Sequence, residues 1–156
     1  MAVITTLNVY PIVPSDVFGF EVNTDVGYGR ETFTLDIGAL SKIEVGAVLE
    51  VDYAAKTATV VAAPADAAAV TALGDLAIFV GRDTPTNPAT AQDFDRLAAY
   101  ADGEVVCITR GDGRGTLYKK NLDFSGTKFY SLSTAAKAAL VEKFTKENRF
   151  KVLDQV

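Results

Sequence analysis

The sequence predicts an α+β fold that is mostly β: a small compact β core of short strands and hairpins, two or three short helices and an extended N-terminal arm. Three observations support this prediction. Short apolar runs alternate with glycine and proline along most of the chain. The run at residues 103–108 is apolar on both faces, which is typical of a strand with protein on each side. Alanine-rich segments with helical spacing lie between the strands.

Residues 1–30 predict an extended arm followed by short edge strands. Pro11 and Pro14 have no amide hydrogen to donate to a β ladder, so a central strand is not expected here. Residues 32–37 alternate apolar and polar side chains and predict the first regular strand.

Residues 45–53 give the strongest strand pattern in the chain. The residues expected on its inner face are Val45, Ala47, Leu49, Val51 and Tyr53. Glu50 and Asp52 are expected to face outward. A short loop at residues 54–56 and a partner strand at residues 57–62 complete a predicted hairpin.

Residues 64–73 are rich in alanine and predict a short helix, with Pro64 at its start and Gly74 just after its end. Residues 76–80 form a compact apolar run and predict a buried strand. Prolines and polar residues at 83–88 predict a surface loop.

Two further helices are predicted. Thr90 can cap the first, which would end at Gly103. Its apolar stripe would consist of Phe94, Leu97, Ala98 and Ala101. The last helix would begin at Ser133 or Thr134 and end near Asn148. Its inward-facing residues would be Ala136, Ala139, Leu140 and Phe144.

Residues 103–108 form the strand around which the core is expected to be built. One face would carry Val105 and Cys107, and the other Val106 and Ile108. The glycines at residues 111–115 would let the chain turn sharply, and residues 116–120 predict the returning strand. Cys107 is the only cysteine, so it cannot form a disulfide within the chain, and its apolar strand predicts a buried side chain.

Residues 122–124 would close the β region, with a break at Ser125 and Gly126, and residues 150–153 predict a last short strand. The chain shows no internal repeat and no linker that would divide it, so we expect a single domain. Its expected parts are an arm with edge strands (residues 1–30), a β core with inserted helices (31–130) and a C-terminal helix and tail (131–156).

Composition narrows the possible functions. Apolar residues make up 49% of the chain and charged residues 22%, as in ordinary globular proteins. The net charge of −5 argues against electrostatic binding to nucleic acid or to an anionic membrane. The chain has no histidine, which excludes Ser-His and Cys-His nucleophilic pairs and histidine-ligated metals. No apolar run is long enough to span a bilayer, and the first residues lack the features of a signal peptide, so we expect synthesis in a cytoplasm.

The segment from Gly111 to Gly115 invites comparison with a phosphate-binding loop. Such a loop presents backbone amides at a helix N-terminus, whereas a strand is predicted next, so we expect a plain glycine-rich turn. Arg110, Gly111 and Asp112 spell a tripeptide found in integrin-binding proteins, but nothing else in the chain indicates a secreted ligand. The carboxylates lack the spacing of a calcium loop. The sequence predicts no catalytic residue, no metal site and no cofactor.

Three glycine-bounded stretches follow one another in a characteristic order. They are Val-Gly-Ala-Val-Leu at residues 45–49, Gly-Asp-Leu-Ala-Ile-Phe-Val-Gly-Arg-Asp at 74–83 and Gly-Glu-Val-Val-Cys-Ile-Thr-Arg-Gly at 103–111. Over roughly residues 40–125 this order resembles the head decoration, or capsid cement, proteins of lambda-type tailed bacteriophages. The last helix and the tail that follows extend beyond the smallest members of that family.

The resemblance implies a virion structural protein and not an enzyme. Proteins of this family are made in the host cytoplasm and bind the outer surface of the expanded, DNA-filled head, where they tie neighbouring capsomers together. Their partner is the major capsid protein, and they are usually trimers on threefold and quasi-threefold sites. No nucleic acid or membrane partner is implied.

In this family the N-terminal arm pairs with the shell protein. The resemblance therefore assigns capsid binding to the apolar residues of the arm, which are Val3, Ile4, Leu7, Val9, Tyr10 and Ile12. A proline-punctuated segment of this kind suits strand addition to a partner's sheet edge. The alternative for the arm is an ordinary edge strand packed on its own domain. The alternatives for the whole chain are another head- or tail-associated phage structural protein, or a small ligand-binding module or enzyme that uses the loop from Gly111 to Gly115.

Overall fold

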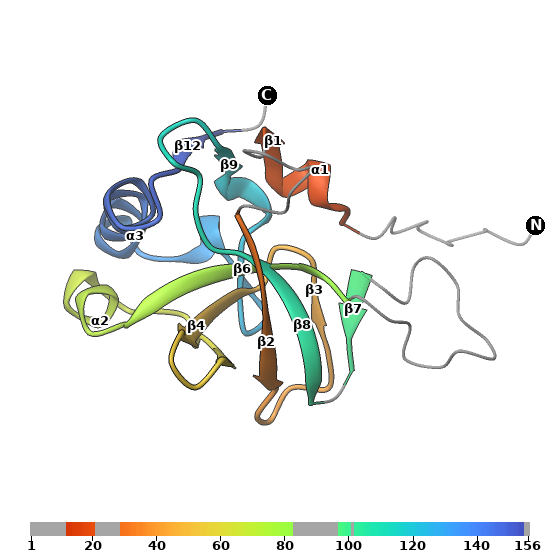
Figure 1. The fold of residues 1–156 in the computed structure, drawn as a ribbon. Helices are drawn as coiled ribbons and strands as arrows, with labels where there is room; N and C mark the ends of the chain where they lie inside the picture. The colour runs from red at the N-terminus through yellow and green to blue at the C-terminus, as the bar shows by residue number, and fades with distance from the viewer. Residues whose placement is uncertain (1–11, 21–28, 83–96, 101, 155–156) are drawn as a thin grey trace, which may run out of the picture.

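The computed structural model describes residues 12–20, 29–82, 97–100 and 102–154, which form a closed β barrel with a second layer packed on it (Figure 1). Strands dominate, and the one helix of more than five residues is α3 (Thr134–Lys146) in this described part of the chain. The predicted class, α+β and mostly β, is confirmed.

The barrel is built from strands that lie far apart in the sequence. In spatial order they are β2 (Arg30–Asp36), β5 (Thr57–Val60), β4 (Val48–Asp52), β6 (Asp75–Gly81) and β8 (Gly103–Ile108). Strand β2 closes the barrel, because it pairs in parallel with β5 and antiparallel with β8. Closure leaves none of these strands with an exposed edge.

Side chains fill the barrel interior. Alternate residues of each strand point inward, as the period of two in a strand requires. The buried interior cluster includes Phe33, Leu35, Leu49, Val51, Ala58, Ala77, Phe79, Val105 and Cys107. The inner faces predicted for residues 32–37 and for the strand at 103–108 are therefore confirmed.

The outer faces of three barrel strands are buried as well. Val48 on β4, Ile78 on β6 and Ile108 on β8 belong to a second apolar cluster, which continues into the last third of the chain. We call the elements from β9 to β12, residues 116–153, the C-terminal layer. Because this layer covers the outer faces, the strand at residues 103–108 has protein on both sides, as its sequence predicts.

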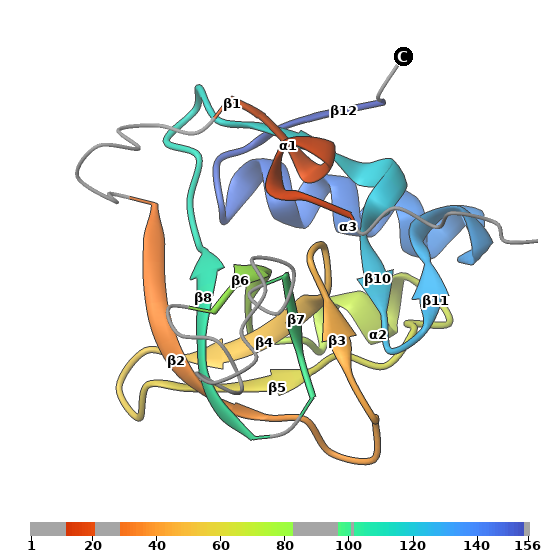
Figure 2. The ribbon, with the colours of Figure 1, turned by 90° about the vertical axis from the view of Figure 1, so that its right-hand side faces the viewer.

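The first and last strands of the C-terminal layer, with α3, lie above the barrel in the ribbon views, while the middle of the layer lies beside the barrel in the second view (Figures 1 and 2). Its elements are β9 (Thr116–Tyr118), η3 (Lys119–Asn121), β10 (Asp123–Phe124), β11 (Thr127–Lys128), η4 (Phe129–Ser131), α3 and β12 (Lys151–Leu153). Two elements from the other end of the chain, α1 (Pro14–Val17) and β1 (Phe18–Phe20), pack on it. The sheet in this layer has the order β1-β9-β12.

Polar side chains cap both longer helical segments. The Ser133 side chain accepts a hydrogen bond from the Ala136 amide (3.2 Å) and starts α3, as predicted. α3 buries Ala136, Leu140 and Phe144 on one face. Asp66 accepts from the Ala69 amide (2.8 Å) and starts α2 (Ala67–Thr71). The second helix is therefore shorter than predicted and begins at this cap and not at the preceding proline.

The long strand predicted at residues 45–53 is wrong as a single element. Gly46 has φ +97°, a left-handed conformation that favours glycine, and the chain bends there between β3 (Ile43–Glu44) and β4. A Cβ atom on Gly46 would lie 2.5 Å from the Asn121 carbonyl oxygen. Before the bend, Val45 belongs to the cluster under the C-terminal layer; after it, Leu49 points into the barrel. The hairpin from β4 to β5 is confirmed.

The helix predicted from Thr90 to Gly103 is wrong at its C-terminal end, while residues 90–96 and the loop at 83–88 lie outside the described residues. Ala98–Ala99 form the short strand β7, which pairs antiparallel with β3. Gly103 opens β8. Both alanines are buried, and Ala99 belongs to the cluster inside the barrel. Helix propensity is highest for alanine but is a weak preference, which burial and strand pairing outweigh here.

The strand predicted at residues 116–120 is present as β9 but does not return along β8. Strand β8 already pairs with β2 and with β6, so it has no free edge for another partner. β9 pairs instead with β1 and, in parallel, with β12. The predicted last strand is thereby confirmed, and it belongs to this separate sheet.

Two shorter segments also differ from the prediction. Ser125 and Gly126 do not end the β region but form the turn of a β10–β11 hairpin. Their φ angles, +52° and +95°, fit a tight hairpin turn with left-handed central residues. Pro14 begins the short helix α1, whose Asp16 side chain accepts from the Val13 amide (2.9 Å).

Candidate functional site

The arm residues assigned to capsid binding lie almost entirely outside the described part of the chain, namely Val3, Ile4, Leu7, Val9 and Tyr10. Ile12 is described, is half-buried and packs against the apolar cluster under the C-terminal layer. The arm therefore joins the domain through an anchored residue. It does so next to α1, which contacts η3 and β9.

The loop from Gly111 to Gly115 is a closed turn. The amide of Gly111 donates to the Asn148 carbonyl (2.8 Å), that of Gly113 to the Arg149 carbonyl (2.7 Å), and that of Gly115 to the Gly111 carbonyl (2.7 Å). Gly111 also packs so closely that a Cβ atom there would lie 2.5 Å from the Phe150 ring. Since these three amides bond to the protein's own carbonyls, the loop does not have the outward-facing donors of a phosphate cradle.

The charged residues around this loop form ion pairs. Arg110 lies 3.2 Å from Glu31, and Asp112 lies 3.0 Å from Arg149. Both residues that carry charge in the Arg-Gly-Asp tripeptide are therefore paired within the chain. This geometry favours a structural role for the loop.

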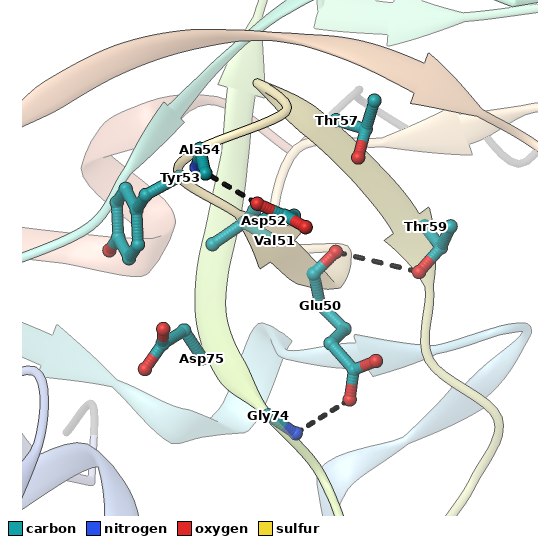
Figure 3. A pocket seen from close by; sticks show the side chains of 9 residues that line it. All are labelled: Glu50, Val51, Asp52, Tyr53, Ala54, Thr57, Thr59, Gly74 and Asp75. Carbon is teal, nitrogen blue, oxygen red and sulfur yellow. Dashed lines mark hydrogen bonds between the residues drawn. The ribbon is translucent and has the colours of Figure 1, made fainter.

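An acidic groove of about 490 Å³ opens at one end of the barrel, between β4, β5 and β6 (Figure 3). On β4, Glu50 lies opposite Thr59 of β5, and Asp52 lies opposite Thr57. Asp75 is the first residue of β6, the strand on the other side of β4. The sequence predicts that Glu50 and Asp52 face outward, but it gives no sign that Asp75 lies near them. Only the pairing of β4 with β6, which places Asp75 opposite Val51, brings them to one opening.

The carboxylates of this groove support the local backbone. The Asp52 side chain accepts from the amides of Ala54 (2.8 Å) and Ala55 (2.9 Å), which closes the β4–β5 turn. The Glu50 side chain accepts from the Gly74 amide (2.7 Å), which fixes the start of β6. No three His, Cys, Asp or Glu side chains in the described residues are grouped to hold a metal ion.

A second groove, of about 460 Å³, lies on the C-terminal layer. We call it the Tyr130 groove; it is lined by Lys119, Phe129, Tyr130, Thr134, Lys137, Ala138, Val141 and Asp154. Its centre is the exposed Tyr130 ring, which Phe129 meets edge-on and Lys137 approaches with its ammonium 5.8 Å from the ring centroid. The surface of the groove therefore combines aromatic, apolar area with positive charge.

Asp154 closes one end of the Tyr130 groove. The Tyr130 hydroxyl donates to its carboxylate, and the Lys119 ammonium lies 3.5 Å away. The hydrogen bond from Tyr130, with the nearby Lys119 charge, lowers the pKa of Asp154. The same hydrogen bond raises the pKa of Tyr130, because the phenol proton is held.

Cys107 is fully buried in the barrel interior. Burial raises its thiol pKa to about 12, so the thiolate is scarcely populated at neutral pH. The prediction of a buried, packing cysteine is confirmed.

Comparison of the chain with family models, with curated proteins and with solved structures gave no match. Among the described residues, no helix has both the length and the apolar character needed to cross a membrane.

Proposed function

We propose that this protein is a head decoration protein that binds the outer surface of an expanded phage capsid and stabilises it by clamping neighbouring capsomers. One observation carries most of the proposal. The three stretches that resemble this family contribute β4, β6 and β8, which are consecutive neighbours in the barrel. The resemblance therefore maps onto one contiguous piece of the fold and not onto scattered segments.

The barrel suits a mechanical role. Its interior is occupied by large side chains, among them Phe33 and Phe79, so it is a rigid packed body. A clamp needs a body of this kind, because a compliant element would transmit little force between capsomers. The two grooves open on the surface of the described domain, where a partner can reach them.

The arm supports the proposal from the sequence side. Residues 1–11 contain no charged side chain and several large apolar ones, and they end next to the anchored Ile12. An apolar segment attached to a rigid domain can add a strand to the edge of a partner's sheet. Contacts repeated at several shell subunits gain strength by multivalency, so no single contact has to be strong.

The proposal is tested by cosedimentation of the purified protein with expanded, undecorated heads of the phage that encodes it. The expected result is saturable binding that raises the temperature at which the heads lose their DNA. Unexpanded heads serve as the control, and binding to them is expected to be much weaker. Failure to bind expanded heads at any protein concentration would rule the proposal out.

A further inference from the structure

Charge is divided unevenly between the two parts of the molecule. Residues 1–109 contain 15 Asp and Glu but five Lys and Arg, whereas residues 110–156 contain five Asp and Glu and ten Lys and Arg. The first part includes the barrel and its acidic groove, and the second includes the C-terminal layer. The C-terminal layer therefore carries net positive charge on a protein that is acidic overall, and a positively charged surface attracts and orients an acidic partner surface.

The C-terminal layer also has exposed apolar side chains. Tyr130 and Leu153 are each 49% exposed, and both belong to the C-terminal layer. The Tyr130 groove beside them has Lys119 and Lys137 on its lining, and Lys120 is exposed on the adjoining turn. Asp154 is the one carboxylate on that lining, and Tyr130 and Lys119 both hold it. A groove with an apolar surface and basic residues around it is complementary to an apolar side chain flanked by carboxylates.

The arm leaves the domain on the same side. α1, which follows Ile12, contacts η3 and β9 of the C-terminal layer, and Figures 1 and 2 both place it at the top of the molecule with β12. The end of the arm that is attached to the domain therefore lies beside the C-terminal layer.

We propose that the C-terminal layer is the face that docks on the shell, and that the Tyr130 groove receives an apolar side chain flanked by carboxylates from the capsid protein. This inference rests on the proposed head-binding function and adds to it the orientation of the domain and the chemistry of the contact. The acidic groove of the barrel then faces away from the shell.

The test compares three variants in cosedimentation with the same expanded, undecorated heads. Lys137→Glu reverses one charge in the Tyr130 groove, and Ala138→Phe fills the groove without changing charge. Lys56→Glu is the matched control: it makes the same charge change at a half-exposed lysine in the turn between β4 and β5, beside the acidic groove of the barrel. Thermal melting of each free variant establishes that it is folded before binding is measured.

We expect Lys137→Glu and Ala138→Phe each to weaken head binding by about tenfold or more, and Lys56→Glu to leave it within about twofold. Added salt should weaken wild-type binding more than binding of Lys137→Glu. If the wild type binds but the three variants bind alike, or Lys56→Glu is as weak as Lys137→Glu, the docking face is wrong while the proposed function stands. If the wild type does not bind, the proposed function fails and this inference fails with it.

Discussion

The barrel and the C-terminal layer are stabilised in different ways. The barrel strands form a continuous hydrogen-bonded ladder that closes on itself around a packed interior. The layer has strands of two or three residues, and side chains tie it to the barrel side: Ser125 donates to the Val61 carbonyl (2.8 Å), and Lys143 to the Leu73 carbonyl (3.1 Å). The barrel is thus stabilised by its closed backbone ladder, and the layer by side-chain hydrogen bonds and by the apolar cluster that it shares with the barrel strands.

The largest expected effect concerns the arm that emerges beside the layer. Deleting residues 2–11 leaves Ile12 and the Val13–Asp16 contacts in place, so we expect the melting temperature to change by no more than a few degrees. Head binding should be abolished, because the apolar attachment segment is gone. If the truncated protein melts far lower, the arm belongs to the core, and its assignment to attachment is wrong.

Two phenylalanine truncations compare the regions directly. Phe79→Ala empties the barrel interior and Phe144→Ala empties the cluster under the layer, and each should cost about 3–5 kcal/mol of unfolding free energy. Because β4, β6 and β8 contribute residues to both clusters, we expect a single cooperative transition in denaturant for each variant. Two separate unfolding transitions, one of them from unfolding of the C-terminal layer alone, would show that the two regions unfold independently.

Asn148 is the most buried polar link between the regions. Its side-chain amide donates to the carbonyls of Leu76 (2.6 Å) and Thr109 (2.8 Å). Asn148→Ala leaves both carbonyls without this donor and should cost about 2–3 kcal/mol in denaturant unfolding. Thr145→Ala, an exposed change on the neighbouring helix, is the control and should cost less than about 1 kcal/mol. Equal losses in the two variants would contradict the linking role of Asn148.

Cys107 tests how tightly the barrel interior is closed. Cys107→Ala should cost about 1–2 kcal/mol through lost packing and leave head binding unchanged while the variant is folded. In the native wild type, a thiol reagent at neutral pH should react no faster than the protein opens, because the thiol pKa is about 12. Rapid labelling of the folded protein would show that the interior is accessible.

The smallest effect is expected at the edge of the Tyr130 groove. The pKa of Asp154 is lowered in the folded state, so its contribution to stability is present above the unfolded pKa and is lost as pH falls through the folded pKa. Melting temperatures of the wild type and Asp154→Asn should therefore differ slightly near neutral pH and converge in acid. If the difference in melting temperature persists unchanged in strong acid, it does not come from the ionised Asp154 carboxylate.

Local pattern predicts the strands whose burial shows in their own sequence, and it misses the features that depend on distant partners. Alternation marks the strand at residues 32–37, and two apolar faces mark the strand at 103–108, because burial is written into each strand's own sequence. The bend at Gly46 and the strand at Ala98–Ala99 depend on partners far along the chain. No local pattern indicates such a partner.

The candidate sites follow the same division. The buried Cys107 can be predicted from sequence, because its burial depends on one local segment. The acidic groove requires β4 to pair with β6, and the Tyr130 groove requires the end of the chain to meet η3 and η4. The excess of Lys and Arg after residue 109 is visible in the sequence, but the fold is needed to show that it falls in the C-terminal layer.

A reconstruction of the decorated head tests the central claim most directly. The account predicts external density at threefold and quasi-threefold positions, one trimer at each, with the C-terminal layer toward the shell and the acidic end of the barrel outward. Expanded heads without added protein provide the reference map. The absence of external density after saturation, or a single copy away from every symmetry axis, would contradict the account.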